Sequence, residues 1–223
     1  GPELAAAILA GAPLAPDALD GSRPFHALDL GRRIAAAIRT SVRDVTAANV
    51  AAMIPGRDPA RRDEVVAFTA HYDHLGIGAP GPDGDSIYNG FSDNAAGTAM
   101  LLAIAEALRD APPARSVLFL FFTGEEKGLL GSSYYASAPL VSLERTAAVI
   151  NLDAGAPPAP PTSWRLAGGS ASTLGDLAAR VAAENGWTAR PSDASPNSDH
   201  WPFLSRGVPA VFLIPGQDWE GMG

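Results

Sequence analysis

The sequence contains no cysteine among its 223 residues. Disulfide bonds and thiolate metal ligands are therefore excluded. The absence leaves the redox compartment of the protein undecided. Any transition metal that this chain binds must be held by histidine, aspartate and glutamate side chains.

Positive charge is also scarce. The chain has 16 lysines and arginines against 24 aspartates and glutamates, which gives a net charge of −8. The basic clusters "GRR" and "PARRDE" are short. Nucleic acid is therefore excluded as an expected partner, whereas metal cations and the cationic ends of substrates suit this charge.

Long hydrophobic runs are missing as well. No apolar run approaches the roughly 20 residues that a membrane-spanning helix needs, so we expect no membrane span. The segment "ELAAAILAGAPLA" near the start lacks the basic region that opens a signal peptide. With 47% hydrophobic residues, the chain can bury one substantial core, and we expect a single domain.

Buried strands alternate with helices along most of the chain. Apolar runs predict strands at 65–70, 116–123, 147–152 and 208–216, and helical spacing predicts helices at 3–10, 94–109 and 172–186. This alternation predicts a three-layer α/β/α fold with a mixed, mostly parallel, twisted sheet. Two β-rich runs around residues 46–48 predict an antiparallel hairpin at the sheet edge, and Ser92 or Asp93 is expected to cap the helix that follows.

Residues with metal-binding or acid–base chemistry gather where these strands end. Carboxyl ends of strands are the edge at which open α/β sheets assemble their sites. The candidates are His71, Asp73, Asp93, Glu125, Glu126, Asp153 and His200.

Each candidate also has an ordinary structural explanation, such as a loop histidine, a helix cap in "SDN" or a turn in "NLDAG". Their coincidence at one edge favours a metal site over separate structural roles. The donors fit Zn²⁺, and the carboxylates exceed what one tetrahedral ion needs, so two zinc ions are implied. Asp73 lies two residues after His71 and is expected to accept the second ring N–H of that imidazole.

Five segments together resemble the signature of the M28 zinc aminopeptidases, a family of two-zinc metallopeptidases that includes bacterial leucyl-type aminopeptidases. The segments are "AHYDHLG", "IYNGFSDNAAG", "FFTGEEKGLLGS", "VINLDAG" and "NSDHWPF…GVPAVFL", spread over residues 49–214. The resemblance implies a flanking segment at 1–40 that packs on the core and an M28-like catalytic domain at 41–223.

The resemblance also implies a division of roles in the site. One zinc ion would be held by His71 and Asp153, the other by Glu126 and His200, with Asp93 bridging both. Glu125 would be the general base. The peptide bond between Asp93 and Asn94 is expected to be cis.

The implied reaction is hydrolysis of the N-terminal peptide bond of peptides with a free N-terminus, with a preference for a hydrophobic first residue. The alternatives are a glutaminyl cyclase or carboxypeptidase on the same fold, and a non-catalytic receptor-like domain. Zinc stoichiometry separates the first alternative from the peptidase, since such cyclases use one ion. Relatives are often exported, so a secreted or periplasmic protein is expected, and the oligomeric state stays open.

The sequence departs from the family pattern in two places. Family members usually continue past the last strand into an "HTP"-type segment and a closing helix, whereas this sequence stops at "GQDWEGMG". No inserted protease-associated domain is present in it. The first departure bears on the substrate pocket and on the last packing layer.

Overall fold

The computed structural model describes residues 2–10, 29–31, 33, 35, 37–42, 44–153, 155 and 160–216. The chain divides into two compact units, Gly1–Val45 and Thr46–Gly223. In the first unit, helix α1 covers Pro2–Leu9, which confirms the helix expected there. The packing of residues 1–40 on the core stays a prediction.

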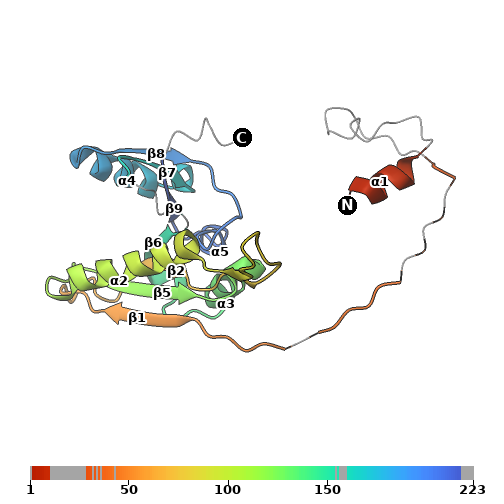
Figure 1. Ribbon diagram of the computed structural model, residues 1–223. Helices are drawn as coiled ribbons and strands as arrows, with labels where there is room; N and C mark the ends of the chain where they lie inside the picture. Colours follow the sequence, from red (N-terminus) through yellow and green to blue (C-terminus); the bar gives the residue numbers. More distant parts are fainter. Residues whose placement is uncertain are drawn as a thin grey trace. The chain divides into compact units, whose positions relative to one another are not determined.

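The second unit is built on a seven-stranded sheet with the order β1-β5-β2-β6-β9-β7-β8. Its strands are β1 (Val50–Ile54), β2 (Val65–His71), β5 (Ser116–Phe122), β6 (Thr146–Leu152), β7 (Ser163–Ala167), β8 (Thr188–Ser192) and β9 (Ala210–Pro215). Neighbouring strands run parallel except for the pairs β1–β5 and β7–β9. The predicted mixed, mostly parallel sheet is therefore confirmed (Figure 1).

Helices and short turns connect the strands. The helices of this unit are α2 (Ala96–Arg109), α3 (Leu130–Ser137), α4 (Thr173–Glu184) and α5 (Trp201–Leu204). A π-helical segment, η2 (Phe91–Ala95), leads into α2, and 3₁₀ turns occur at η3 (Glu125–Lys127), η4 (Leu143–Arg145) and η5 (Gly169–Ala171). A separate two-stranded sheet pairs β3 (Gly76–Ile77) with β4 (Ile87–Tyr88).

Strand β5 shows why the sheet is buried on both faces. Its side chains alternate between two apolar clusters, because successive residues of a strand point to opposite faces. Leu118, Leu120 and Phe122 join the cluster that contains Tyr135 of α3 and Phe203 of α5. Val117 and Phe119 join the cluster around Leu101 of α2. A core on each face produces the three layers expected from the sequence.

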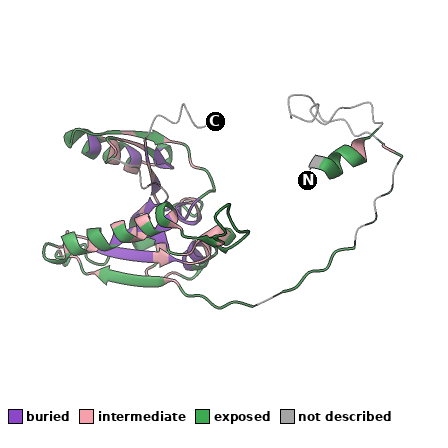
Figure 2. Cartoon of the chain, viewed as in Figure 1, coloured by how far each residue is buried: buried purple, intermediate pink, exposed green. Residues whose placement is uncertain are grey.

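Strand β1 lies at the edge of the sheet and contrasts with the buried centre (Figure 2). Four of its five residues are exposed, whereas β5 is buried along most of its length. The predicted hairpin around residues 46–48 is wrong: residues 44–49 carry no regular secondary structure, and β1 pairs antiparallel with β5 instead. The distant strand β5 supplied the partner that the local pattern could not identify.

Candidate metal centre

Three adjacent parallel strands bring the predicted residues to one edge of the sheet. The order β5-β2-β6 places the carboxyl ends of these strands side by side. His71 is the last residue of β2, Glu125 begins the turn after β5, and Asp153 follows β6. Asp93 lies in η2, ahead of α2, and reaches the same edge.

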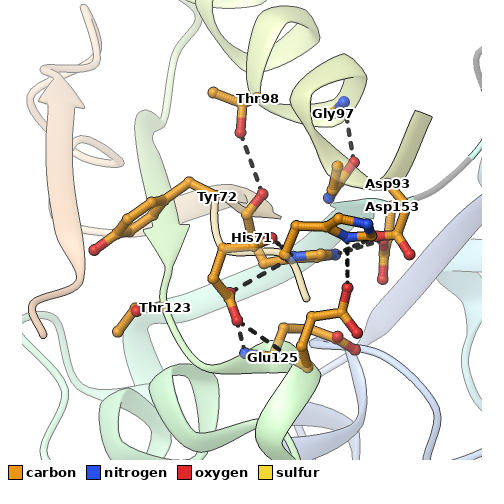
Figure 3. A network of polar contacts seen from close by, with 12 residues as sticks. His71, Tyr72, Asp93, Gly97, Thr98, Thr123, Glu125 and Asp153 are labelled. Carbon is orange, nitrogen blue, oxygen red and sulfur yellow. Dashed lines mark hydrogen bonds and ion pairs between the residues drawn. The ribbon is translucent and has the colours of Figure 1, made fainter. Parts of the chain in front are cut away.

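His71 is the centre of this cluster, and Figure 3 shows its ring pointing toward Asp93 and Asp153. Its Nδ1 lies 3.0 Å from the backbone carbonyl oxygen of Asp73, which can only accept a hydrogen bond. Nδ1 therefore carries a proton, and in the neutral ring Nε2 carries a lone pair. Yet Nε2 lies 2.9 Å from Asp153 Oδ1 and 3.0 Å from Asp93 Oδ1. A lone pair among carboxylate oxygens requires a cation, either a proton or a metal ion.

The pKa of His71 reflects the same arrangement. Burial alone lowers the pKa, but the hydrogen bond and charge of Asp153, with the charges of Glu125 and Asp199, raise it from 6.5 to about 10. Without a metal, the site therefore holds a proton on His71 at neutral pH. A divalent ion can replace this proton, because imidazole and carboxylate are ordinary zinc ligands.

Asp73 holds the two adjacent glutamates by their backbone. Its carboxylate accepts hydrogen bonds from the backbone N–H groups of Glu125, at 3.2 Å, and Glu126, at 3.4 Å. The expected bond from the His71 ring to this carboxylate is not formed, since Nδ1 bonds the carbonyl of Asp73 and lies 3.6 Å from the carboxylate. Asp73 thus orients His71 with its main chain and the glutamate turn with its side chain.

A second group of potential ligands shares Asp93 with the first. Among the described residues, ligand atoms converge within 4.8 Å of one another in two groups, His71–Asp93–Asp153 and His74–Asp93–Glu126. The position of Asp93 in both groups fits the bridging role expected for it. His74 was not a predicted site residue, although it stands within the quoted motif "AHYDHLG".

His200 lies outside both groups. Its side chain is completely buried, and its ring packs against Phe212 with centroids 5.6 Å apart. Burial lowers the pKa of His200 to about 4, against weaker opposing effects of Asp153 and the Ser198 backbone. The ring therefore stays neutral and belongs to the apolar packing beside β9.

The segment that contains His200 contacts the metal centre through another residue, Ser198, which bonds Asp153. Its hydroxyl donates a short hydrogen bond to Asp153 Oδ2, the carboxylate oxygen that does not face His71. Asn151 donates from Nδ2 to Ser198 Oγ at 2.7 Å, and Thr69 donates to Asn151 Oδ1 at 2.7 Å. Every donor in this buried chain points toward Asp153, so the chain fixes the orientation of the carboxylate.

The link between Asp93 and α2 is a cis peptide bond, Asp93–Asn94, as predicted. Neither Ser92 nor Asp93 caps α2, which corrects that expectation. The buried Asn94 bonds the first turn of α2 in their place. Its Oδ1 accepts a hydrogen bond from Gly97 N at 3.0 Å, and its Nδ2 donates one to Leu152 O at 3.0 Å. Asn94 thereby ties the start of the helix to the end of β6, next to Asp153.

Glu125 belongs to neither ligand group among the described residues, yet it lies close to both. Burial raises its pKa from 4.5 to about 7; the charge of His71 opposes this, while Asp153, Asp199 and Glu126 add to it. A carboxyl group with a pKa near neutral can both accept and return a proton.

Comparison with known proteins identifies the family. The profile of peptidase family M28 matches residues 49–220 and so includes every site residue described above. The chain belongs to peptidase family M28.

The M28 chain is similar in sequence to several aminopeptidases. It is 28% identical over 165 residues to aminopeptidase YwaD of Bacillus subtilis, covering 70% of this chain and 33% of that protein. It is 29% identical over 191 residues to the probable leucine aminopeptidase 2 of Aspergillus fumigatus, covering 81% of this chain and 36% of that protein. The chain thus spans about a third of the length of these relatives.

Solved structures share the fold of this M28 domain. A zinc aminopeptidase from Bacillus subtilis superposes with a TM-score of 0.62 at 24% identity, over 77% of this chain and 42% of the other. A glutaminyl cyclase from Porphyromonas gingivalis superposes with a TM-score of 0.60 at 21% identity, over 78% of this chain and 66% of the other.

Of the helices in the described part of this chain, none has the length and apolarity needed to cross a bilayer.

Proposed function

We propose that this M28 domain is the catalytic part of a two-zinc aminopeptidase that hydrolyses the first peptide bond of peptides with a free N-terminus. One observation carries the proposal: two groups of imidazole and carboxylate ligands share Asp93 at the edge of the sheet where Glu125 lies. Its similarity to aminopeptidases of bacteria and fungi supports the same activity.

The donors fit zinc in chemistry and in charge. His71, Asp93 and Asp153 would hold one ion, and Asp93 and Glu126 would contribute to the other. The three carboxylates carry three negative charges against four positive charges on two ions, so a bound anion can complete the balance. Bound zinc would lower the pKa of a coordinated water toward about 7 and polarise the scissile carbonyl group.

Glu125 would perform the proton transfers. Its carboxylate would accept the proton of the attacking water and return it to the leaving amine, so one group acts first as base and then as acid. Asp73 supports this role, because its carboxylate accepts the backbone N–H of Glu125 and fixes the start of the turn. Ser198 would keep the carboxylate of Asp153 oriented through its hydrogen bond.

The charge around the centre favours substrates with a free N-terminus. Asp93 and Glu126 share one ligand group and Glu125 directly precedes Glu126, in a chain of net charge −8. An α-ammonium group is attracted to such a field, whereas an internal peptide segment gains nothing from it. Preference for a hydrophobic first residue is proposed from the family resemblance.

The proposal is tested by hydrolysis of aminoacyl-nitroanilides, with N-acetylated substrates as the matched control. We expect turnover of the free amines only, its loss on chelation, its recovery with zinc and a stoichiometry of two ions per chain. Absence of turnover in the zinc-loaded protein, or equal cleavage of the acetylated substrates, would contradict the aminopeptidase assignment. One ion per chain together with cyclisation of N-terminal glutamine would indicate the cyclase alternative.

A further inference from the structure

The two adjacent glutamates lie in a loop whose backbone is strained. This loop, residues 123–129, connects β5 to α3 and is called the glutamate loop below. Its residues Gly124, Gly128 and Leu129 have φ angles of +68°, +97° and +59°. Glycine adopts such angles freely, whereas they cost energy for leucine, because its Cβ atom approaches the backbone. A strained loop keeps one shape only where its surroundings hold it.

The side chain of Asn49 bonds the backbone on both sides of the glutamate loop. Its Oδ1 accepts a hydrogen bond from Thr123 N at 3.2 Å, and its Nδ2 donates one to Gly131 O at 2.8 Å. Thr123 and Gly131 also bond each other, since Gly131 N donates to Thr123 O at 2.9 Å. Three hydrogen bonds therefore close the base of the loop, and Asn49 makes two of them.

Gly131 allows these groups to meet because it lacks a Cβ atom. A Cβ at this position would lie 2.4 Å from Asn49 Oδ1, 2.3 Å from Thr123 O and 2.8 Å from Thr123 N. Gly131 is buried in the first turn of α3. Space for the side chain of Asn49 and the backbone of Thr123 therefore requires glycine here.

The glutamate loop is held from both neighbours of the strand that it follows. Strand β5 lies between β1 and β2 in the sheet. Asn49 directly precedes β1, whose pairing with β5 begins at Val50 and Phe121, so its amide extends that pairing beyond the strands. Asp73 follows β2 and accepts the backbone N–H groups of the two glutamates. Asn49 thus fixes the base of the loop, while Asp73 fixes its turn.

We propose that Asn49 is a positioning residue of this centre, which places Glu125 for proton transfer and Glu126 for zinc binding by closing the base of their loop. The inference rests on the proposed function. Thr123, which Asn49 bonds, lies two residues before Glu125, so a shift of the base moves both carboxylates together. Asn49 acts through the backbone of the loop and is not itself a catalytic residue.

Asn49→Ala tests the inference in the zinc-saturated protein. We expect kcat for aminoacyl-nitroanilides to fall by about 10- to 100-fold, because a catalytic group misplaced by about 1 Å costs rate on that scale. KM should stay nearly unchanged, since a group that acts in the transition state affects kcat and kcat/KM alike. Zinc competition titration should show one ion weakened by about 10- to 100-fold and the other unchanged, because one of the two ligand groups contains Glu126.

Ser116→Ala is the matched control. Ser116 Oγ accepts from Gly56 N at 2.9 Å and donates to Arg62 O at 2.6 Å, so this variant also loses two side-chain hydrogen bonds, at the opposite end of the β1–β5 pair. It should lose comparable stability in urea denaturation and keep kcat and both zinc affinities.

Two further variants act on the same contacts. Asn49→Asp keeps the oxygen that accepts from Thr123 and loses the donor to Gly131, so it should lower kcat in a side chain of the same size. It replaces Asn49→Ala if circular dichroism shows that the alanine variant does not fold. Gly131→Ala should lower kcat although the Asn49 amide is still present.

The outcomes separate this inference from the proposed function. If the unchanged chain is active and the Asn49 variants keep its kcat and zinc affinities, the role of Asn49 is wrong and the proposed function stands. An equal loss of kcat in Asn49→Ala and Ser116→Ala would also overturn this role, because a general loss of stability would explain both. Absence of turnover in the unchanged, zinc-loaded chain would overturn the proposed function and the role of Asn49 with it.

Discussion

Glu125 and Glu126 show how neighbouring residues of the same type receive different tasks. Both backbone N–H groups bond the carboxylate of Asp73, which fixes the 3₁₀ turn that follows β5. From this turn, Glu126 joins His74 and Asp93 in a ligand group, whereas Glu125 remains outside it. A ligand and a proton carrier can therefore stand side by side without competing for the same ion.

Exchange of Glu125 for glutamine tests this division. Glu125→Gln keeps the shape of the side chain and removes its capacity to take a proton. We expect turnover to fall by about 10²- to 10⁴-fold, with the zinc content unchanged, because general acid–base catalysis contributes on that scale. Kinetic assay with metal analysis measures both quantities.

Glu126→Gln is the matched control for this exchange, since it should lose zinc as well as activity. Loss of zinc from both variants would show that the two glutamates are ligands alike. Full activity in Glu125→Gln would exclude it as the base.

Ser198 is expected to govern the affinity of the first zinc site. Its hydroxyl donates to Asp153, and removal also leaves the Asn151 amide without its acceptor. We expect Ser198→Ala to weaken this zinc ion by about 10- to 100-fold, whereas Ser198→Thr, which keeps the hydroxyl, should restore most of the affinity. Zinc competition titration measures the change.

Ser116→Ala is the control that distinguishes a specific effect of Ser198 on zinc binding from a general loss of stability. Ser116 is also buried and accepts from Gly56 N while donating to Arg62 O, so its loss should cost comparable stability and leave zinc binding unchanged. Equal zinc affinities in Ser198→Ala and the unchanged chain would show that Asp153 needs no support from Ser198.

At the residue scale, the sequence predicted which residues lie at the ends of the strands, but it did not predict which way their side chains point. The apolar strands and the charged residues behind them placed His71, Asp153 and the glutamates at one edge, where the structure has them. Which loop histidine turns inward depends on packing. His200 fits among apolar neighbours, while His74 faces Glu126, and the motif around each residue does not distinguish these outcomes.

At the element scale, the central strands were predictable and the edges were not. β5 is an unbroken apolar run because both its faces are covered. β7 and β8 escaped prediction, since they are short and mixed in polarity, and β8 contains Pro191. Proline lacks an N–H group and is tolerated on an edge strand, and β8 is the last strand of the sheet.

Helix α2 depends on one buried amide for its position. Asn94 bonds Gly97 in the first turn of the helix and Leu152 at the end of β6. We expect Asn94→Ala to lower the free energy of unfolding by about 1–3 kcal/mol, because two buried backbone groups lose their partner. Zinc affinity should fall as well, since Asp93 directly precedes this residue. Urea denaturation and zinc titration measure the two effects.

Asn185→Ala provides the comparison for Asn94. Asn185 also bonds a backbone carbonyl, that of Val181 at the end of α4, but it is exposed to solvent. Its loss should cost less stability and no zinc affinity. An equal cost for both variants would argue against a special role of Asn94.

At the scale of the whole molecule, the candidate metal centre brings several negatively charged carboxylates close together in a chain that already carries a net negative charge. Net charge is −8, and the carboxylates of Asp93, Glu126 and Asp153 converge in the two ligand groups. Bound cations relieve this repulsion and stabilise the folded state by mass action. The stability of the metal-free protein must therefore respond to protons in place of metal ions.

Four groups at and beside the centre decide this response. Burial raises the pKa of Glu125 and that of Asp199 to about 7 each, while the pKa of His71 rises to about 10 against the effect of burial, chiefly through Asp153. Each of these three groups binds its proton more tightly in the folded state, so its contribution to stability is lost as pH rises toward the folded pKa. Burial lowers the pKa of His200 from 6.5 to about 4, so its own effect ends near pH 6.5.

Above pH 6.5, the three raised groups therefore act in the same direction. We expect the free energy of unfolding of the metal-free protein to fall steadily between pH 6.5 and 9, because the folded state releases protons there that the unfolded state has already lost. The zinc-loaded protein should show a smaller fall, since His71, the group with the highest of these pKa values, is then already deprotonated by the metal. Urea denaturation at several pH values, with chelator or with excess zinc, measures both dependences. A metal-free protein that gains stability across this range would show that the carboxylates and His71 do not hold protons as the structure indicates.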